Sequence, residues 1–298
     1  MQEIVINTNQ AEQRLDKFIH RHLGKPPKSF VQKLLRKKSI TLNGKKADGS
    51  HLLVVGDVVR FFVSQETIDK FAAPVHEFPA GEVDVIFEDD HVILLNKPAN
   101  LSAQPDSLGG DSLVGRLRGE GDFQPVTVNR LDKNTTGITI CAKTLPAAQA
   151  LSKLIHDRKI QKVYIGIAHG RIDKEMTLRG NHTKDKTRNV AKITEGEGKI
   201  AHTQIIPLYY EYTRDATVLE IHLHTGRSHQ IRVHLQSINH PLLGDTKYGG
   251  KGAGRQMLHA HKLVFPKLTG VLASLSSKTF TASPPDDMKP ILKNTQKI

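Results

Sequence analysis

The apolar residues of this chain fall into short runs separated by turn signals, and this pattern excludes most fold classes. Beyond residue 82 the runs have strand length, as in Val92-Ile93-Leu94-Leu95. Only 146–156 and 228–238 carry a clear helical period there, with Pro146 in the first turn of one and Ser228 as the cap of the other. With so few helices, a fold in which strands and helices alternate regularly is excluded. The sequence therefore predicts an α+β fold with a mainly antiparallel sheet.

The same reading places the individual strands of this region. A hairpin is expected around Glu88-Asp89-Asp90, and further strands follow it along the chain. The predicted strands span 83–87, 91–96, 126–129, 137–142, 162–168 and 217–224.

Residues 1–65 form a separate small α/β unit in this interpretation. Residues 14–23 have one apolar helical face, and a second helix follows Pro26-Pro27 with Ser29 as its cap. A strand at 39–42, an Asn43-Gly44 turn and a strand at 58–63 complete the unit.

Each of these two helices carries a basic stripe on its outer face. Between residues 12 and 63 there are twelve Lys or Arg and four Asp or Glu. These stripes are either solvated helix faces or an RNA-binding surface. Because two adjacent faces are both positively charged, the RNA-binding interpretation is favoured. The predicted RNA-binding residues are Arg14, Lys17, Arg21, Lys33, Arg36 and Lys37.

The remaining domain boundaries follow from the positions of proline and glycine and from the polarity of the segments. Pro74, Pro79 and Gly81 mark residues 66–82 as a linker. Residues 83–281 read as one strand-rich domain, and the polar, proline-containing stretch 282–298 as a flexible tail.

Charge and cysteine content limit the partners and the compartment. Across 298 residues, 43 Lys and Arg against 30 Asp and Glu leave a net charge of +13, which indicates a polyanion: nucleic acid or an acidic membrane. The chain lacks an apolar run of membrane length, a signal peptide and a basic helix with a strongly apolar opposite face. Its single cysteine, Cys141, lies in an apolar run and is expected to be buried. A cytoplasmic protein without a membrane partner is expected.

The usual motifs of nucleotide-dependent, serine-hydrolase and zinc-protease chemistry are absent from the sequence. His222 and His224 share one strand face, whereas His229 and His234 are spaced poorly for one helical face, and no carboxylate lies among them, so neither a metal nor another cofactor is expected. The glycine-rich run 248–255 reads as a mobile loop.

Two polar stretches remain as candidates for chemistry. In Asn129-Arg130-Leu131-Asp132-Lys133, a strand ends at an aspartate between two cations. Spacing alone leaves an ordinary turn aspartate as the favoured interpretation. In the second stretch, Arg227 lies between Gly226 and a helix start, where its side chain is well placed to enter a pocket.

These stretches resemble the signatures of the RluA-type pseudouridine synthases (RluC/RluD-like). The first continues to Thr135-Thr136-Gly137, and the second runs over 226–234 as Gly-Arg-Ser-His-Gln-Ile-Arg-Val-His. Further matches in the family's order lie at 162–164, 198–203, 240–245, 248–249 and 258–260. The N-terminal unit resembles an S4 RNA-binding domain through 14–16, 33–35, 42–44 and 56–57.

The resemblance implies roles for individual residues. Asp132 would be the catalytic aspartate, Arg227 its ion-pair partner, and Tyr164 the ring that packs on the target base. Asn129, Arg130 and Leu258 would bind substrate, with Arg130 supporting the strand from which the uridine is displaced. A guanidinium beside the aspartate would keep it ionised. Attack at C1′, addition at C6 and abstraction of a 2′ proton all stay open for the carboxylate.

The implied function is isomerisation of uridine to pseudouridine in structured RNA, without a cofactor. Ribosomal RNA is the expected substrate and transfer RNA the alternative; a catalytically silent RNA-binding or ribosome-assembly factor is the rival from another class. Asn129 in place of the family's His touches substrate positioning, and Thr136 in place of Ser keeps the hydroxyl. A monomer without an obligatory protein partner is expected.

Overall fold

The chain divides into two compact units. The computed structural model describes residues 2–24, 26–64, 66–67, 71, 83–105, 111–117, 124–185, 187–252 and 254–292. One unit contains Met1–Pro79, Arg118–Gln124 and Thr144–Pro146, and the other contains the rest of the chain. The expected linker, 66–82, lies almost entirely outside the described residues.

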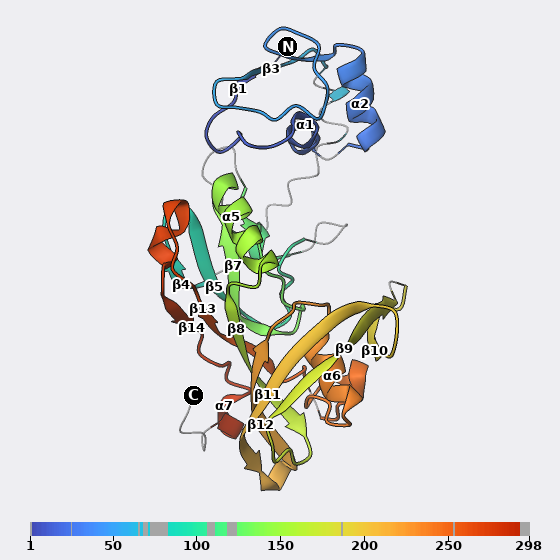
Figure 1. The fold of residues 1–298 in the computed structure, drawn as a ribbon, viewed down its shortest axis with the longest axis vertical. Coiled ribbons are helices and arrows are strands. Elements are labelled where there is room, and N and C mark those ends of the chain that lie inside the picture. Colours follow the sequence, from blue (N-terminus) through green and yellow to red (C-terminus); the bar gives the residue numbers. More distant parts are fainter. Residues whose placement is uncertain are drawn as a thin grey trace. The chain divides into compact units, whose positions relative to one another are not determined.

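The first unit packs two helices against a small antiparallel sheet. Its strands are β1 (Gln2–Val5), β2 (Ile40–Leu42) and β3 (Val58–Phe61), in the order β1-β3-β2. Helices α1 (Leu15–His22) and α2 (Lys28–Arg36) bury the apolar faces that the sequence predicts (Figure 1). The Asn43-Gly44 turn is confirmed, with φ of 50° and 74°.

The Ser29 cap is wrong. Helix α2 begins two residues earlier than that cap implies, at Lys28 after the N-cap residue Pro27, and no side chain caps it. The ring of Pro27 already fixes a suitable φ, so the helix starts without a hydroxyl acceptor.

The second unit is built on one large sheet of mainly antiparallel strands. Its path is β10-β9-β11-β12-β8-β13-β7-β5-β4, with β14 paired to β13 and β6 paired to β7. Among the described strands of this sheet, β7 and β13 pair in parallel. The sequence predicts this α+β class correctly. The strand bounds are β4 Asp84–Glu88, β5 Val92–Lys97, β6 Val126–Thr127, β7 Thr136–Ala142, β8 Gln161–His169, β9 Met176–Asp185, β10 Val190–Thr194, β11 Lys199–Glu211, β12 Ala216–Leu223, β13 Leu258–Val264 and β14 Thr279–Thr281.

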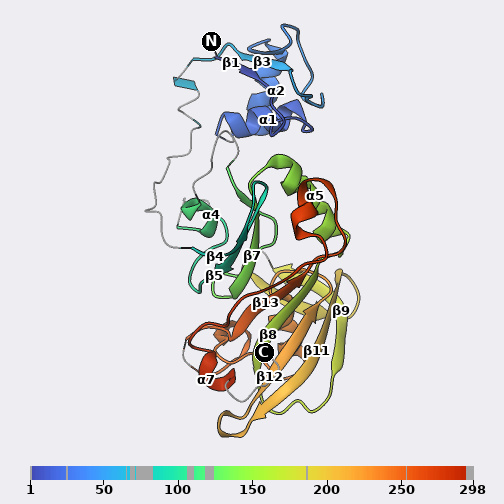
Figure 2. The same ribbon diagram turned by 90° about the vertical axis from the view of Figure 1, so that its left-hand side faces the viewer.

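Short helical elements cover the two faces of this sheet. They are α4 Leu113–Arg116, α5 Leu145–His156, α6 Gln230–Ser237, α7 Lys289–Leu292 and the 3₁₀ turns η1 Tyr212–Arg214, η2 Thr246–Tyr248 and η3 Gly270–Leu275. Figure 2 shows η3 beside α5, and both share a core with β5 and β7. Helix α6 packs through Ile231 and Leu235 on the face of β8 that carries Tyr164. The opposite face of β8, with Ile165 and Ile167, receives α7.

The expected flexible tail is corrected by this packing. Met288, Ile291 and Leu292 are buried, because their side chains fill the apolar face that β8 and β12 leave open. Residues 293–298 lie outside the described residues. Cys141 is buried as predicted.

Candidate active site

A cavity of about 890 Å³ opens in the second unit where the loop before β7 faces the start of α6. Asp132 lines it from that loop, Tyr164 from β8, and Arg227 and His229 from the residues before α6. The sequence-predicted Asp132, Tyr164, Arg227, Asn129, Arg130 and Leu258 all line this cavity.

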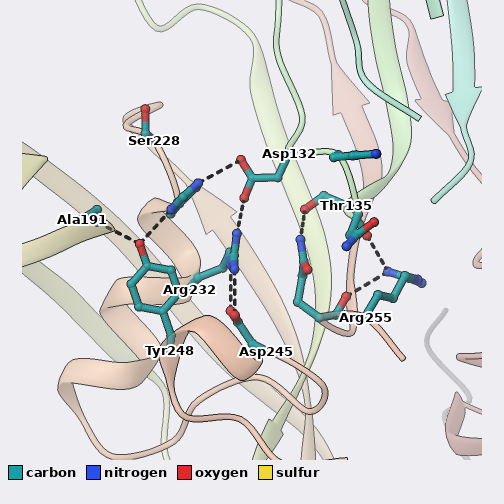
Figure 3. A network of polar contacts seen from close by, with 12 residues as sticks. Asp132, Thr135, Ala191, Ser228, Arg232, Asp245, Tyr248 and Arg255 are labelled. Atoms are coloured by element: carbon teal, nitrogen blue, oxygen red, sulfur yellow. Dashed lines mark hydrogen bonds and ion pairs between the residues drawn. The ribbon is translucent and has the colours of Figure 1, made fainter. Parts of the chain in front are cut away.

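Asp132 is held by an arginine inside α6 (Figure 3). Nη1 of Arg232 donates to Oδ2 of Asp132 over 2.9 Å. The same guanidinium donates from Nε and Nη2 to both oxygens of Asp245, each over 2.7 Å. The Arg232 side chain is only 8% exposed and that of Asp132 is 28% exposed. The carboxylate therefore has one oxygen fixed by a buried cation while part of the group faces the cavity.

The two carboxylates beside Arg232 determine the protonation state of its guanidinium. Burial acts to lower the pKa of Arg232, but the hydrogen bonds and negative charges of Asp245 and Asp132 raise it above its ordinary value. Arg232 also lies over the ring of Tyr248, at 5.0 Å from the centroid. The guanidinium is thus a permanent positive charge beside Asp132.

Arg227 is not the ion-pair partner of Asp132, which corrects the sequence expectation. Its Nε donates to the carbonyl oxygen of Ile200 over 3.2 Å, at the exposed rim of the cavity. The expected Ser228 cap is wrong as well, because His229 is the N-cap residue and no side chain caps there. The side chain of Gln230 accepts the backbone N–H of Arg227 over 3.0 Å.

Three buried side chains clamp the loop that follows Asp132. Nζ of Lys97 donates to the carbonyl oxygen of Lys133 over 2.9 Å, and also to those of Pro98 and Leu101. Arg255 donates to the carbonyl of Asn134 over 3.1 Å, and Gln256 to Oγ1 of Thr135 over 3.3 Å (Figure 3). Burial, with the nearby charge of Arg255, lowers the pKa of Lys97 to about 7, and the charge of Asp132 opposes this.

The segment expected to be a tail takes part in this clamp. Asp287 accepts two hydrogen bonds from Arg255, at 2.8 and 2.9 Å. Arg255 is 7% exposed, although the sequence places it at the end of a glycine-rich run expected to be mobile. The run 248–255 therefore ends in a fixed residue, and Ala253 within it lies outside the described residues.

An apolar wall faces the carboxylate. Tyr164, 7% exposed, packs in the same core as Leu131, Ile221 and Leu258. Burial raises the pKa of the Tyr164 phenol, and the negative charge of Asp132 adds to the effect. A neutral ring beside an anionic carboxylate suits a flat, uncharged base.

The two residues that precede Leu131 on the loop differ in what they contact. Asn129 uses its amide on the backbone of β7, donating to Ile138 over 3.2 Å and accepting from Ile140 over 2.7 Å. Its direct contact with substrate stays a prediction. Arg130 is exposed at the cavity, where its side chain is available to a nucleic acid.

The six predicted RNA-binding residues are all exposed in the first unit. Arg14 forms an ion pair with Asp16 at 2.7 Å, and burial of part of Arg21 lowers its pKa. Lys33 and Arg36 of α2, with Lys37 at its C-terminal end, form one outward basic face, opposite the buried Val31, Leu34 and Leu35.

Metal and membrane features can be judged only for the part of the chain that the structure describes. Within it, no three His, Cys, Asp or Glu side chains are grouped to hold a metal ion. No described helix has the length and apolarity to cross a bilayer.

Sequence reasoning missed Arg232, Asp245, Lys97 and His229. Arg232 had a readable signal, because a charge between Ile231 and Val233 on a short helix predicts a buried ion pair. Lys97, directly after the apolar run of β5, had the same signal. Asp245 and His229 had only their places in the family motifs at 240–245 and 226–234, since their partners lie far away in the sequence.

The chain is similar to known RNA-modifying proteins over nearly its whole length. A family model described as RNA pseudouridylate synthase matches residues 91–237, and an S4 domain model matches residues 13–59. Ribosomal large subunit pseudouridine synthase C of Vibrio cholerae is 31% identical over 89% of each chain. The protein of that name from Rickettsia prowazekii is 35% identical over 80% of this chain and 82% of its own.

Solved structures share the fold of the second unit's sheet. Human RNA Pseudouridylate Synthase Domain Containing 4 superposes with a TM-score of 0.57 at 21% identity, covering 70% of this chain and 92% of that chain. Human RNA Pseudouridylate Synthase Domain Containing 1 gives a TM-score of 0.54 at 23% identity, covering 73% of this chain and 97% of that one.

Proposed function

This chain belongs to the RNA pseudouridylate synthase family, and from that premise we propose that it isomerises uridines of large-subunit ribosomal RNA with Asp132 as the catalytic group. The observation that carries the assignment of Asp132 is its ion pair with the buried Arg232, at the edge of a cavity lined by Tyr164. The curated relatives named for the ribosomal large subunit support the choice of RNA. Such an enzyme would act in the cytoplasm.

The geometry suits a carboxylate that must stay ionised in a partly dry site. Isomerisation breaks the bond between C1′ and N1, turns the uracil and joins C5 to C1′, so the anion must be reactive beside the sugar. Arg232 places a buried positive charge beside Asp132, and its hydrogen bonds to Asp245 hold the guanidinium in that position. Oδ2 is thereby occupied, and Oδ1 is the oxygen that would approach the nucleoside.

The cavity also offers a place for a base that has left its stack. The buried ring of Tyr164 would pack on the uracil, and Leu131 and Leu258 of the same core would complete an apolar slot. Arg130, exposed next to that slot, would contact the strand that the uridine leaves. Extrusion costs a few kcal/mol, which these contacts would offset.

The test compares ribosomal and transfer RNA from cells with the wild-type gene, without it, and with Asp132→Asn. We expect at least one pseudouridine of large-subunit RNA to disappear in the deletion and in Asp132→Asn, as mapped by carbodiimide labelling and primer extension. Circular dichroism of the purified variant controls for folding. Loss of a transfer RNA site instead would favour the alternative substrate, and no lost site would favour a silent RNA-binding factor.

A further inference from the structure

His229 lies beside the catalytic carboxylate without a role in the chemistry described so far. Its Nε2 is 3.9 Å from Oδ1 of Asp132, the oxygen that Arg232 does not hold. No residue that the structure describes donates a hydrogen bond to Oδ1. Whatever fixes the direction of this oxygen therefore bears on the proposed reaction.

Two hydrogen bonds connect β10 to Nδ1 of His229 (Figure 3). The backbone N–H of Ala191 in β10 donates to Oη of Tyr248 over 2.9 Å. Oη lies 2.7 Å from Nδ1 of His229. When the phenol accepts from the amide and donates its own O–H to Nδ1, neutral His229 carries its proton on Nε2, the nitrogen that faces Asp132.

The backbone of His229 adopts a conformation that is unfavourable for a residue with a β-carbon. Its φ is 55° and ψ 21°, the left-handed conformation, at the N-cap of α6. A residue with a β-carbon costs about 1 kcal/mol there relative to glycine. His182 in β9 holds this turn through its Nε2, 2.8 Å from the carbonyl oxygen of Ser228. Strain that the surroundings maintain is typical of residues aimed at a functional group.

The groups around the ring keep it neutral. Asp132 faces it from the loop before β7, Arg232 from α6, Lys247 and Tyr248 from η2, and Lys184 from β9. Burial lowers the pKa of His229, Asp132 opposes the effect, and the three cations add to it. At neutral pH the imidazole is thus an N–H donor and not a second cation.

We propose that His229 is a positioning residue for Asp132, whose Nε2–H directs Oδ1 toward the nucleoside while Arg232 holds Oδ2. The inference rests on the proposed function of Asp132. The separation of 3.9 Å exceeds a hydrogen bond, and the contact shortens when substrate excludes water from the cavity, as catalytic hydrogen bonds commonly do. The hairpin of β9 and β10 is coupled to the carboxylate through Ala191 and His182.

Two substitutions separate positioning from mere structural support. His229→Asn keeps an oxygen near Nδ1 for Tyr248 and tolerates the left-handed backbone, but has no N–H where Nε2 lies. His229→Gln places an amide N–H near Nε2. We expect the kcat of His229→Asn to fall about 10- to 100-fold, while its KM changes less than about threefold. The His229→Gln variant should recover part of the lost kcat. The Tm of His229→Asn should equal or exceed that of the wild type, because asparagine relieves the strain of the left-handed backbone.

A wild-type kcat in His229→Asn would overturn the proposal. So would an equal loss of kcat in His229→Asn and His229→Gln, if the Tm of both variants is also lower than that of the wild type. An inactive wild type on every RNA tested would instead count against the proposed function. A second measurement does not depend on activity: ¹⁵N NMR of the imidazole. The wild type should show the Nε2–H tautomer, Tyr248→Phe should mix the tautomers, and Asp132→Asn should lower the pKa of His229. A wild-type Nδ1–H tautomer would overturn the proposal.

Discussion

The partner of Asp132 shows what a sequence pattern can and cannot locate at the scale of a residue. Arg227 next to Gly226 is placed to reach a pocket, and it lines the cavity. Yet the guanidinium on Asp132 belongs to Arg232, five residues further on. Arg232 lies inside α6 and Arg227 precedes it, and a local sequence pattern does not show where the helix begins or which arginine faces Asp132. Asp132 itself could be identified from sequence, because its polar strand end and flanking motif are local.

Replacing Arg232 by lysine should disable the enzyme. A lone ammonium cannot donate to Asp132 and to both oxygens of Asp245 together, so the carboxylate loses its fixed direction. We expect kcat for pseudouridine formation to fall at least about 100-fold and the free energy of unfolding to fall by about 2 kcal/mol. Single-turnover kinetics and urea unfolding measure the two effects.

Arg227→Lys is the matched control, since it makes the same chemical change at the cavity rim. Its kcat should stay within about threefold of the wild type, because Arg227 hydrogen-bonds a backbone carbonyl and not Asp132. Loss of kcat in Arg227→Lys, with an active Arg232→Lys, would restore Arg227 as the partner of Asp132.

At the scale of elements, prediction succeeded where the hydrophobic period is local. The continuous apolar run of β5 is readable because nearly the whole strand is buried. The apolar stripes of α1, α2 and α5 are readable because each helix buries one face. Strands β9, β10 and β11 were missed. Most of their residues are exposed or half-buried, and pairing across the β9–β10 hairpin and with β12 holds them in place. Those partners are not visible in a local window.

Gly137 lets two strands approach too closely for a side chain. Its φ is 107°, and a β-carbon there would lie 2.3 Å from the carbonyl oxygen of Ala260, where β7 pairs in parallel with β13. Gly137→Ala must push the strands apart, so we expect the free energy of unfolding to fall by more than about 3 kcal/mol. Urea unfolding of the purified variant measures it.

Gly196→Ala separates crowding from backbone strain. Gly196 has a similar φ of 113°, but a β-carbon there would meet nothing within 4 Å. Its loss should be about 1 kcal/mol, the cost of the conformation alone. Similar losses at both glycines would show that the approach of β7 to β13 is not a close one.

For the whole molecule, charge predicted a polyanionic partner and the family resemblance narrowed it to RNA, but the sequence did not show where the second domain ends. The residues after 281 are polar, which is typical of a frayed terminus, yet Asp287 ties them through Arg255 to the loop of Asp132. A few buried side chains, Met288 and Ile291 among them, suffice to fix the segment. A polar segment can therefore pack when its few apolar residues contact an apolar face of the sheet.

Stability should fall in mild acid because the second unit buries neutral histidines. Burial lowers the pKa of His259 and of His234 from 6.5 to about 4. Between these values the unfolded chain binds more protons than the folded one, so stability is lost as the pH falls. From pH 7 to pH 5 each group should cost about 2 kcal/mol. Urea unfolding at both values should show this, and His259→Gln should reduce the difference. A difference that His259→Gln leaves unchanged would contradict the assignment.

The basic face of α2 gives the last prediction, which concerns affinity for long RNA. Lys33, Arg36 and Lys37 are exposed opposite the buried side of the helix, in a unit that matches the S4 domain. If each contacts a phosphate, each releases counterions on binding. Replacing all three by Gln should flatten the slope of log affinity against log salt by about 2 to 3.

The experiment uses binding isotherms for the full-length wild type and triple variant on one ribosomal RNA fragment over a series of salt concentrations. Activity on a short oligonucleotide is the control, and it should change little because these residues line no part of the Asp132 cavity. Parallel slopes with equal affinities would mean that α2 does not grip RNA. A changed slope with unchanged oligonucleotide activity would separate the two tasks: the first unit would bind the RNA electrostatically, and the second would select and isomerise the uridine.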